Sequence, residues 1–163
     1  MKKFKLTSEF IVDISGVKLF RIKALIEFGN VKAGDLGGYI EKEENLSHMG
    51  NAWVSGNARV SSNARVSGDA QVFGDARVSG DKDYAYAHGF GSCNRTTTFF
   101  RLKDGDVGVR CGCFYGTLAQ FRDNVCETHG ETKKAQEYLM LADLMELRFE
   151  EDENEVGNRK YVE

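Results

Sequence analysis

Five nearly identical hexads follow one another between Asn51 and Gly80, and this short repeat constrains the fold more than any other feature of the chain. Each hexad starts with Asn or Asp, continues with Ala, and carries Val at its fourth position. A fixed short period of this kind indicates a stacked repeat, in which each unit is stabilised by its neighbours.

The spacing within one hexad predicts a short strand followed by a corner. Ala and Val are two residues apart, so on an extended backbone both side chains point to one apolar face, and the residue between them points the opposite way. Gly or Ser followed by Asn or Asp then suits a tight turn. Three such strands close a triangular coil, which stacks residues eighteen apart. We therefore expect Trp53 over Gln71 and Arg59 over Arg77, with these side chains facing outward.

Five hexads make fewer than two coils, so the repeat needs other segments to close its ends. Before it, Asn45 to Gly50 fits the hexad pattern loosely, and after it Tyr84 and Phe90 continue the valine positions with aromatic residues. At the N-terminus, the alternation from Lys18 to Ala24 predicts a half-buried strand in a small antiparallel cap.

The C-terminal third predicts a hairpin and two helices. Two β-rich runs flank the Asp-Gly turn at Asp104 and Gly105, which is a strong hairpin signal. Thr117 and Gln120 form a plausible capping box for a helix to about Glu127. A second helix, from about Thr132 to Phe149, would carry one apolar stripe. The stripe consists of Ala135, Tyr138, Leu139, Ala142, Met145 and Phe149.

The predicted fold is therefore mainly β: a short parallel β-helix with an antiparallel cap and a C-terminal hairpin plus two α-helices. The corresponding segments are an N-terminal β cap over residues 1–35, a hexapeptide β-helix over 36–92, a ββαα module over 93–149 and an acidic tail over 150–163.

Composition excludes few functions, but it bears on location. The net charge of −3 provides no general attraction for nucleic acid. No apolar run has the length of a secretion signal or of a membrane span, so we expect a cytoplasmic protein with reduced cysteines.

Several stretches together resemble the hexapeptide-repeat proteins of bacteriophages and prophages, a family described as polymer-forming or acyltransferase-like. These stretches are Phe20 to Ala24 with Gly34 to Gly38, the hexads, Thr96 to Phe100, and Cys111 to Phe114 through Thr117 to Thr128-His129-Gly130. The resemblance implies that the coil is left-handed. It also implies a phage accessory protein that acts in the cytoplasm of a bacterial host.

The strongest candidate site is a polar cluster at the start of the hairpin. Hydroxyl and guanidinium groups together suit a phosphate or a carboxylate. The alternative is a plain Thr-rich strand with solvated arginines. The candidate ligand-binding residues are Asn94, Arg95, Thr96, Thr97, Thr98, Arg101 and Arg110.

Two other chemistries are weaker predictions. Acyl transfer would need a histidine base, but His129 lies at a helix end, and His48 and His88 occupy structural positions in degenerate hexads. A metal site built on Cys111 and Cys113 lacks the Cys-x-x-Cys spacing typical of zinc. We therefore expect no catalytic residue, no metal and no cofactor.

The outward arginines of the hexads are offset by aspartates, which makes a poor track for nucleic acid. With the phage context that the resemblance implies, the sequence favours a non-enzymatic counter-defence protein that sequesters a small anionic ligand, such as an immune signalling nucleotide. We expect a homo-oligomer, with a trimer favoured over a dimer through the C-terminal helices. The alternatives are an inhibitor that binds a host defence protein and, less favoured, an acyltransferase.

Overall fold

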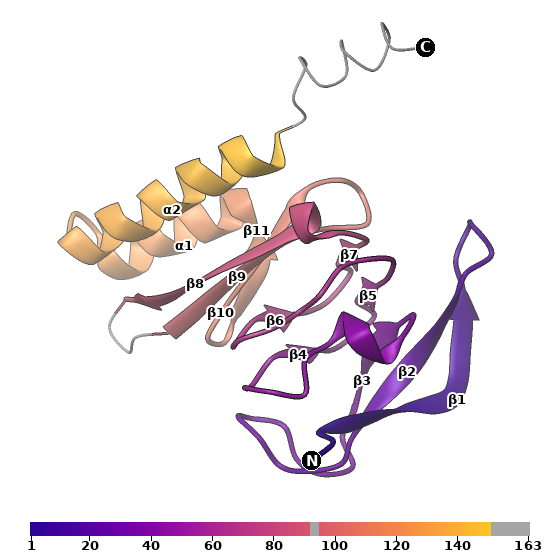
Figure 1. Ribbon diagram of the computed structural model, residues 1–163. Helices are drawn as coiled ribbons and strands as arrows, with labels where there is room; N and C mark the ends of the chain where they lie inside the picture. The colour runs from indigo at the N-terminus through magenta and orange to yellow at the C-terminus, as the bar shows by residue number, and fades with distance from the viewer. Residues whose placement is uncertain (92–94, 151–163) are drawn as a thin grey trace, which may run out of the picture.

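The computed structural model describes residues 1–91 and 95–150, which form three sheets and two C-terminal helices (Figure 1). The five-stranded sheet has the order β1 (Phe4–Val12), β2 (Lys18–Ala24), β3 (Leu36–Ile40), β5 (Arg59–Val60) and β7 (Arg77–Val78). A separate parallel pair joins β4 (Trp53–Val54) to β6 (Gln71–Val72). The four-stranded antiparallel sheet has the order β11 (Phe114–Thr117), β10 (Val107–Cys111), β9 (Arg95–Arg101) and β8 (Tyr84–Phe90). The helices are α1 (Leu118–His129) and α2 (Lys133–Phe149), and short 3-10 turns span Glu43–Asn45 (η1) and Asp81–Asp83 (η2).

The hexads pair in the register that their period predicts. Trp53 lies opposite Gln71 and Arg59 opposite Arg77, in parallel and eighteen residues apart. The alanine and valine of each hexad are at most 1% exposed, and together they form most of one hydrophobic core. Local periodicity was therefore sufficient to identify the inward face.

The predicted fold class, a mainly β protein built on a left-handed parallel β-helix, is nevertheless wrong. The hexads contribute strands of only two residues, and these are divided between a five-stranded mixed sheet and the separate β4–β6 pair. The long strands and both helices come from the flanking segments, so the fold is mixed α/β. The physical reason is the small number of hexads, because a repeat this short cannot bury its own ends and depends on its flanks.

At the N-terminal end, the buried Lys3 completes the hydrogen bonding of the hexads. The carbonyls of Ala58, Ala70 and Ala76 each accept a backbone N–H from the strand stacked before them, donated by Tyr39, Trp53 and Arg59 respectively. Strand β4 has no such neighbour, and the carbonyl of Ala52 instead accepts from the Lys3 side chain at 2.7 Å. The Lys3 side chain thus supplies the hydrogen bond that a neighbouring strand would otherwise donate to Ala52.

Trp53 is a second correction to the predicted arrangement. It was expected to face outward, but it is only 3% exposed and belongs to the same hydrophobic core as the alanines and valines of the hexads. Phe28 packs edge-on against its ring at a centroid distance of 5.3 Å, and a Cβ on Gly37 would come within 2.7 Å of it. The segment before β3 therefore covers an indole that the repeat pattern alone places in solvent.

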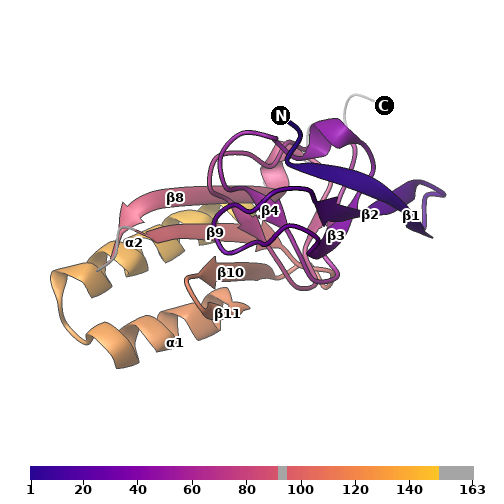
Figure 2. The ribbon, with the colours of Figure 1, turned by 90° about the horizontal axis from the view of Figure 1, so that it is seen from below.

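At the C-terminal end, the four-stranded sheet lies between the hexads and the helices (Figures 1 and 2). Neighbouring residues of β9 point to opposite faces: Phe100 belongs to the hexad core, whereas Phe99 packs with α1 and α2. The hydroxyl of Thr98 accepts a hydrogen bond from the backbone N–H of Gln71 at 2.9 Å. One strand therefore joins the two cores.

The predicted hairpin and helices are present. Strands β9 and β10 pair antiparallel, and Thr117 with Gln120 forms the predicted capping box of α1. The predicted stripe of α2 is buried except for Leu139, which is partly exposed. The hairpin description was incomplete, since β8 and β11 extend the pair to four strands. Phe90 accordingly packs against the helix-side core rather than continuing the valine positions.

Candidate functional site

A cleft of about 610 Å³ lies where the hexads meet the four-stranded sheet. Its walls come from β8, β9 and β10, from the turn after β10, from two hexads and from the loop before β3. The lining residues are Gly29, Asn30, Asn51, Asp69, Gln71, His88, Arg95, Thr96, Arg110, Gly112 and Cys113. The volume falls within the range of small-molecule sites, and most of the lining residues have polar or charged side chains.

Two arginines give the cleft fixed positive charge. Arg110 lies opposite Thr98 on one side and Tyr115 on the other, and its guanidinium carbon is 4.5 Å from the centre of the Phe73 ring. This cation–π contact restrains the side chain without using its hydrogen-bond donors.

The second arginine, Arg95, begins β9 and is exposed. Its guanidinium crosses the turn at Gly112, where an added Cβ would collide with it. Gly112 also has a φ of 60°, so the tight turn and the close approach both favour glycine. The turn that ends β10 is thus shaped to admit an arginine from the neighbouring strand.

His88 and Thr96 supply neutral hydrogen-bonding groups beside the arginines. They are directly opposite each other on β8 and β9, and Nδ1 of His88 lies 2.8 Å from the hydroxyl of Thr96. His88 is exposed, so its other ring nitrogen faces solvent or a ligand as either donor or acceptor.

The opposite wall of the cleft comes from stacked positions of two hexads. Asn51 and Asp69 each begin a hexad and are eighteen residues apart. Gln71 donates from its side chain to the carbonyl of Asn51 at 2.9 Å, which fixes the amide. The amides of Asn51 and Gln71 can donate and accept and the Asp69 carboxylate accepts, whereas the two arginines across the cleft only donate. The cleft can therefore hold a ligand that is anionic at one end and carries hydrogen-bond donors at the other.

The structure brings together three of the predicted site residues, namely Arg95, Thr96 and Arg110. Thr97 and Thr98 are fully buried and do not line the cleft. The hydroxyl of Thr97 points to the sulfur of Cys111 on the helix side, at 3.3 Å. These two threonines have structural roles, because alternation along β9 turns one toward each core. Asn94 lies outside the described residues.

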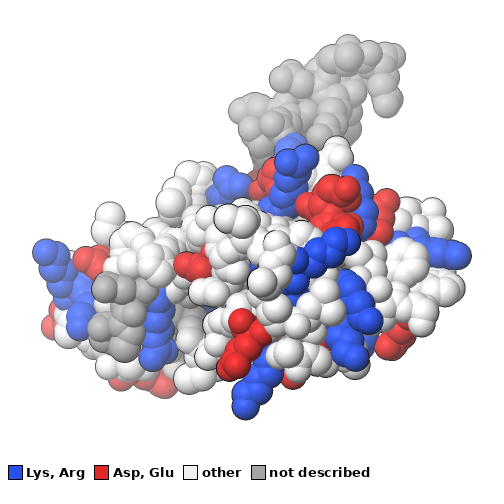
Figure 3. Space-filling view, turned by 60° about the horizontal axis from the view of Figure 1, so that its bottom comes forward, with Lys and Arg blue, Asp and Glu red and all other residues white. Residues whose placement is uncertain are grey.

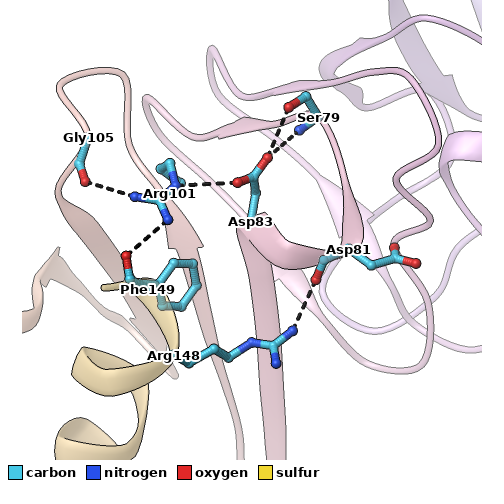
Figure 4. Close-up of polar contacts among 7 residues, drawn as sticks. All are labelled: Ser79, Asp81, Asp83, Arg101, Gly105, Arg148 and Phe149. Atoms are coloured by element: carbon cyan, nitrogen blue, oxygen red, sulfur yellow. Dashed lines mark hydrogen bonds and ion pairs between the residues drawn. The ribbon is translucent and has the colours of Figure 1, made fainter. Parts of the chain in front are cut away.

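Arg101, the remaining predicted site residue, does not line this cleft, and its contacts join three elements of the fold (Figure 4). It forms an ion pair with Asp83 at 3.3 Å and donates to the carbonyl oxygens of Gly105 and Phe149 at 3.2 and 3.1 Å. The guanidinium thereby connects η2, the β9–β10 turn and the end of α2. The sequence could not distinguish it from Arg110, since both are arginines on one hairpin.

Sequence reasoning missed the wall that the hexads contribute. The stacking of Asn51 and Asp69 follows from the eighteen-residue period, so the sequence was sufficient to predict that these two residues lie together. His88 was not, because its place opposite Thr96 depends on β8 joining the hairpin.

A second hollow, of about 870 Å³, lies near the N-terminus and contains His48. Nδ1 of His48 accepts the backbone N–H of Lys3, and Nε2 is 3.1 Å from Glu43. A hydrogen bond from Lys2 holds the pKa of Glu43 below its usual value. With both ring nitrogens engaged, His48 has no free nitrogen to act as a general base.

The distribution of metal-ligating, basic and apolar side chains is a further feature of the described residues. Within the described ranges 1–91 and 95–150, no three His, Cys, Asp or Glu side chains are grouped as a metal site would require. The basic side chains visible in Figure 3 are scattered among acidic ones and form no continuous track on that face. No helix in the part of the chain that the structure describes has both the length and the apolar character to cross a membrane.

Comparison with known proteins adds no identity. No protein-family model matches the chain, and no curated protein is significantly similar to it in sequence.

Proposed function

We propose that the protein is a non-catalytic binding protein that captures a small anionic ligand in the cleft between the hexads and the four-stranded sheet. The observation that carries this proposal is the convergence of Arg95 and Arg110, on two different strands, on one cleft of about 610 Å³. Thr96 and His88 lie beside them. Guanidinium and hydroxyl groups in this arrangement suit phosphate oxygens.

The opposite wall narrows the class of ligand. Asn51, Asp69 and Gln71 offer both donors and acceptors, which match the edge of a nucleobase better than they match a simple inorganic anion. We therefore propose a nucleotide. The resemblance to phage hexapeptide-repeat proteins suggests that it is an immune signalling nucleotide, which the protein would withdraw from a host defence system.

Calorimetric titration and thermal-shift measurements with a panel of cyclic and linear nucleotides test the proposal. Loss of charge-assisted hydrogen bonds should cost about 1.5–3 kcal/mol, so we expect Arg110→Met to weaken binding by roughly 10- to 100-fold. Arg65→Met is the matched control, because Arg65 is exposed on a hexad but does not line the cleft. A flat response of the unmodified protein to the whole panel would overturn the proposal.

An inhibitor of a host protein is the second candidate, supported by the hairpin of β1 and β2. Near its tip, Phe10, Val12 and Ile14 are 46%, 54% and 107% exposed. Exposed apolar groups of this kind often mark protein contacts. This function predicts that Ile14→Asp abolishes association with a host effector, whereas Arg110→Met leaves it unchanged.

A further inference from the structure

Helix α2 carries a second apolar stripe, on the face that does not touch the sheet. Met140, Leu144 and Leu147 are 72%, 53% and 67% exposed. Their spacing of four and then three residues places them on one side of the helix. Ala142 and Met145, on the opposite side, are buried against the sheet and α1. Helix α2 is thus apolar on two faces, and only one of them packs against the rest of the protein.

On one flank of this stripe, two charged residues are placed so that they complement each other across an antiparallel pair; on the other flank Asp143 is already paired with Arg122. Glu137 and Arg148 lie on the same side of the stripe, eleven residues and therefore about 16 Å apart along the axis. Their midpoint nearly coincides with the midpoint of Met140 and Leu144. When two copies of such a helix run antiparallel, the same flank of each faces the other. Glu137 of one copy then meets Arg148 of the other, twice.

We infer that α2 is a homodimer interface, in which the Met140, Leu144 and Leu147 stripes of two copies pack antiparallel and Glu137 pairs with Arg148 of the second copy. A twofold axis would place Met140 of each copy against Leu144 of the other. Such an interface is isologous, which is the commonest symmetry of soluble oligomers. It differs from the trimer that the resemblance to β-helical proteins favours.

Both charged groups are available for this pairing. Glu137 forms no ion pair with another described residue. Arg148 donates to the carbonyl of Asp81 at 3.1 Å (Figure 4). A guanidinium has five N–H donors, so this bond leaves others for a carboxylate. Arg148 is exposed, so its remaining donors are accessible to a second copy.

The inferred interface is independent of the ligand cleft. The cleft lies between the hexads and the four-stranded sheet, and α2 lies on the other side of that sheet (Figure 1). Dimerisation through α2 therefore leaves the cleft open. One helix pair about 25 Å long is smaller than a standard protein interface. We therefore expect a dissociation constant in the micromolar range rather than a permanent dimer.

Sedimentation velocity over roughly 1 to 100 µM protein tests the inference, a range that brackets micromolar affinity. The unmodified chain should pass from monomer to dimer, and Leu144→Lys should remain monomeric. Glu137→Arg and Arg148→Glu should each weaken the dimer by about tenfold, and the double variant should recover most of the loss. Lys5→Glu, an equal charge reversal on β1 at the opposite end of the molecule from α2 (Figure 1), is the control and should leave association unchanged.

Thermal unfolding of each variant separates loss of association from loss of folding. An unmodified chain that stays monomeric throughout, or that forms trimers, would overturn the inference. So would a Leu144→Lys variant that is folded and still dimeric. A double charge reversal that fails to recover affinity would refute the antiparallel pairing.

Discussion

The buried Lys3 amine makes the stability of this protein depend on pH in a direction that can be tested. Lys3 is only 1% exposed, and burial lowers its pKa from 10.5 to about 8. Its side chain donates to the carbonyl of Ala52 at 2.7 Å and lies 4.7 Å from the centre of the Phe28 ring. Substitution with methionine keeps most of the volume but removes the titrating group.

The sign follows from the proton balance of the two states. Between pH 8 and 10.5 the unfolded chain holds the Lys3 proton and the folded chain releases it, so folding is favoured as pH rises through this window. Below the folded pKa the full cost of burying the ammonium is present. Between pH 7 and pH 10 the Lys3 contribution to the free energy of unfolding should rise by about 2.5 kcal/mol.

Lys3→Met loses this pH dependence and also leaves the Ala52 carbonyl without its partner, which costs about 1–3 kcal/mol. At pH 7 this destabilisation is opposed by an effect of similar size, because the variant no longer buries a charged ammonium group. We therefore expect Lys3→Met to unfold near the urea midpoint of the unmodified protein at pH 7 and well below it at pH 10.

Urea unfolding of both proteins at the two pH values measures this difference. Lys5→Met is the matched control, because Lys5 lies two residues further along the chain, in β1, and is exposed. A gap between the unmodified protein and Lys3→Met that is the same at both pH values would refute the reasoning. A gap that is smaller at pH 10 than at pH 7 would show that the pH dependence has the opposite sign.

Two further predictions concern the junction between the hexads and the sheet. Thr98→Val should destabilise the protein by about 1–2 kcal/mol in urea unfolding, because the partly buried N–H of Gln71 loses its acceptor. Thr96→Val, in the partly exposed cleft, should cost much less. Gly74→Ala should lower the midpoint of thermal unfolding more than Gly105→Ala does. Both glycines have positive φ values, of 68° and 90°, but only at Gly74 would the new methyl group strike the Tyr115 hydroxyl. Equal effects of the two alanine substitutions would contradict that explanation.

The candidate site shows where reasoning from single segments reaches its limit. The polar run that begins β9 attracted attention because its residue types suit an anion, and Arg95 and Thr96 do line the cleft. The same run also contains Thr97 and Thr98, which are fully buried. An alternating strand between two cores turns successive side chains to opposite faces, and the sequence does not show that both faces are covered.

The sequence by itself determined what depends on residues close together in the chain. The hexad period established the eighteen-residue register, and the turn and capping residues located the hairpin and both helices. Such features follow from backbone geometry, because each is decided within a few residues.

Only the tertiary structure decided what covers each side chain. The hexads are divided between two sheets, and Trp53 is buried against Phe28. Arg101 binds the end of α2, whereas His88 lies beside the arginines of the cleft. The physical reason is that burial depends on which distant segments meet. A repeat too short to close its own ends leaves that choice to its flanks.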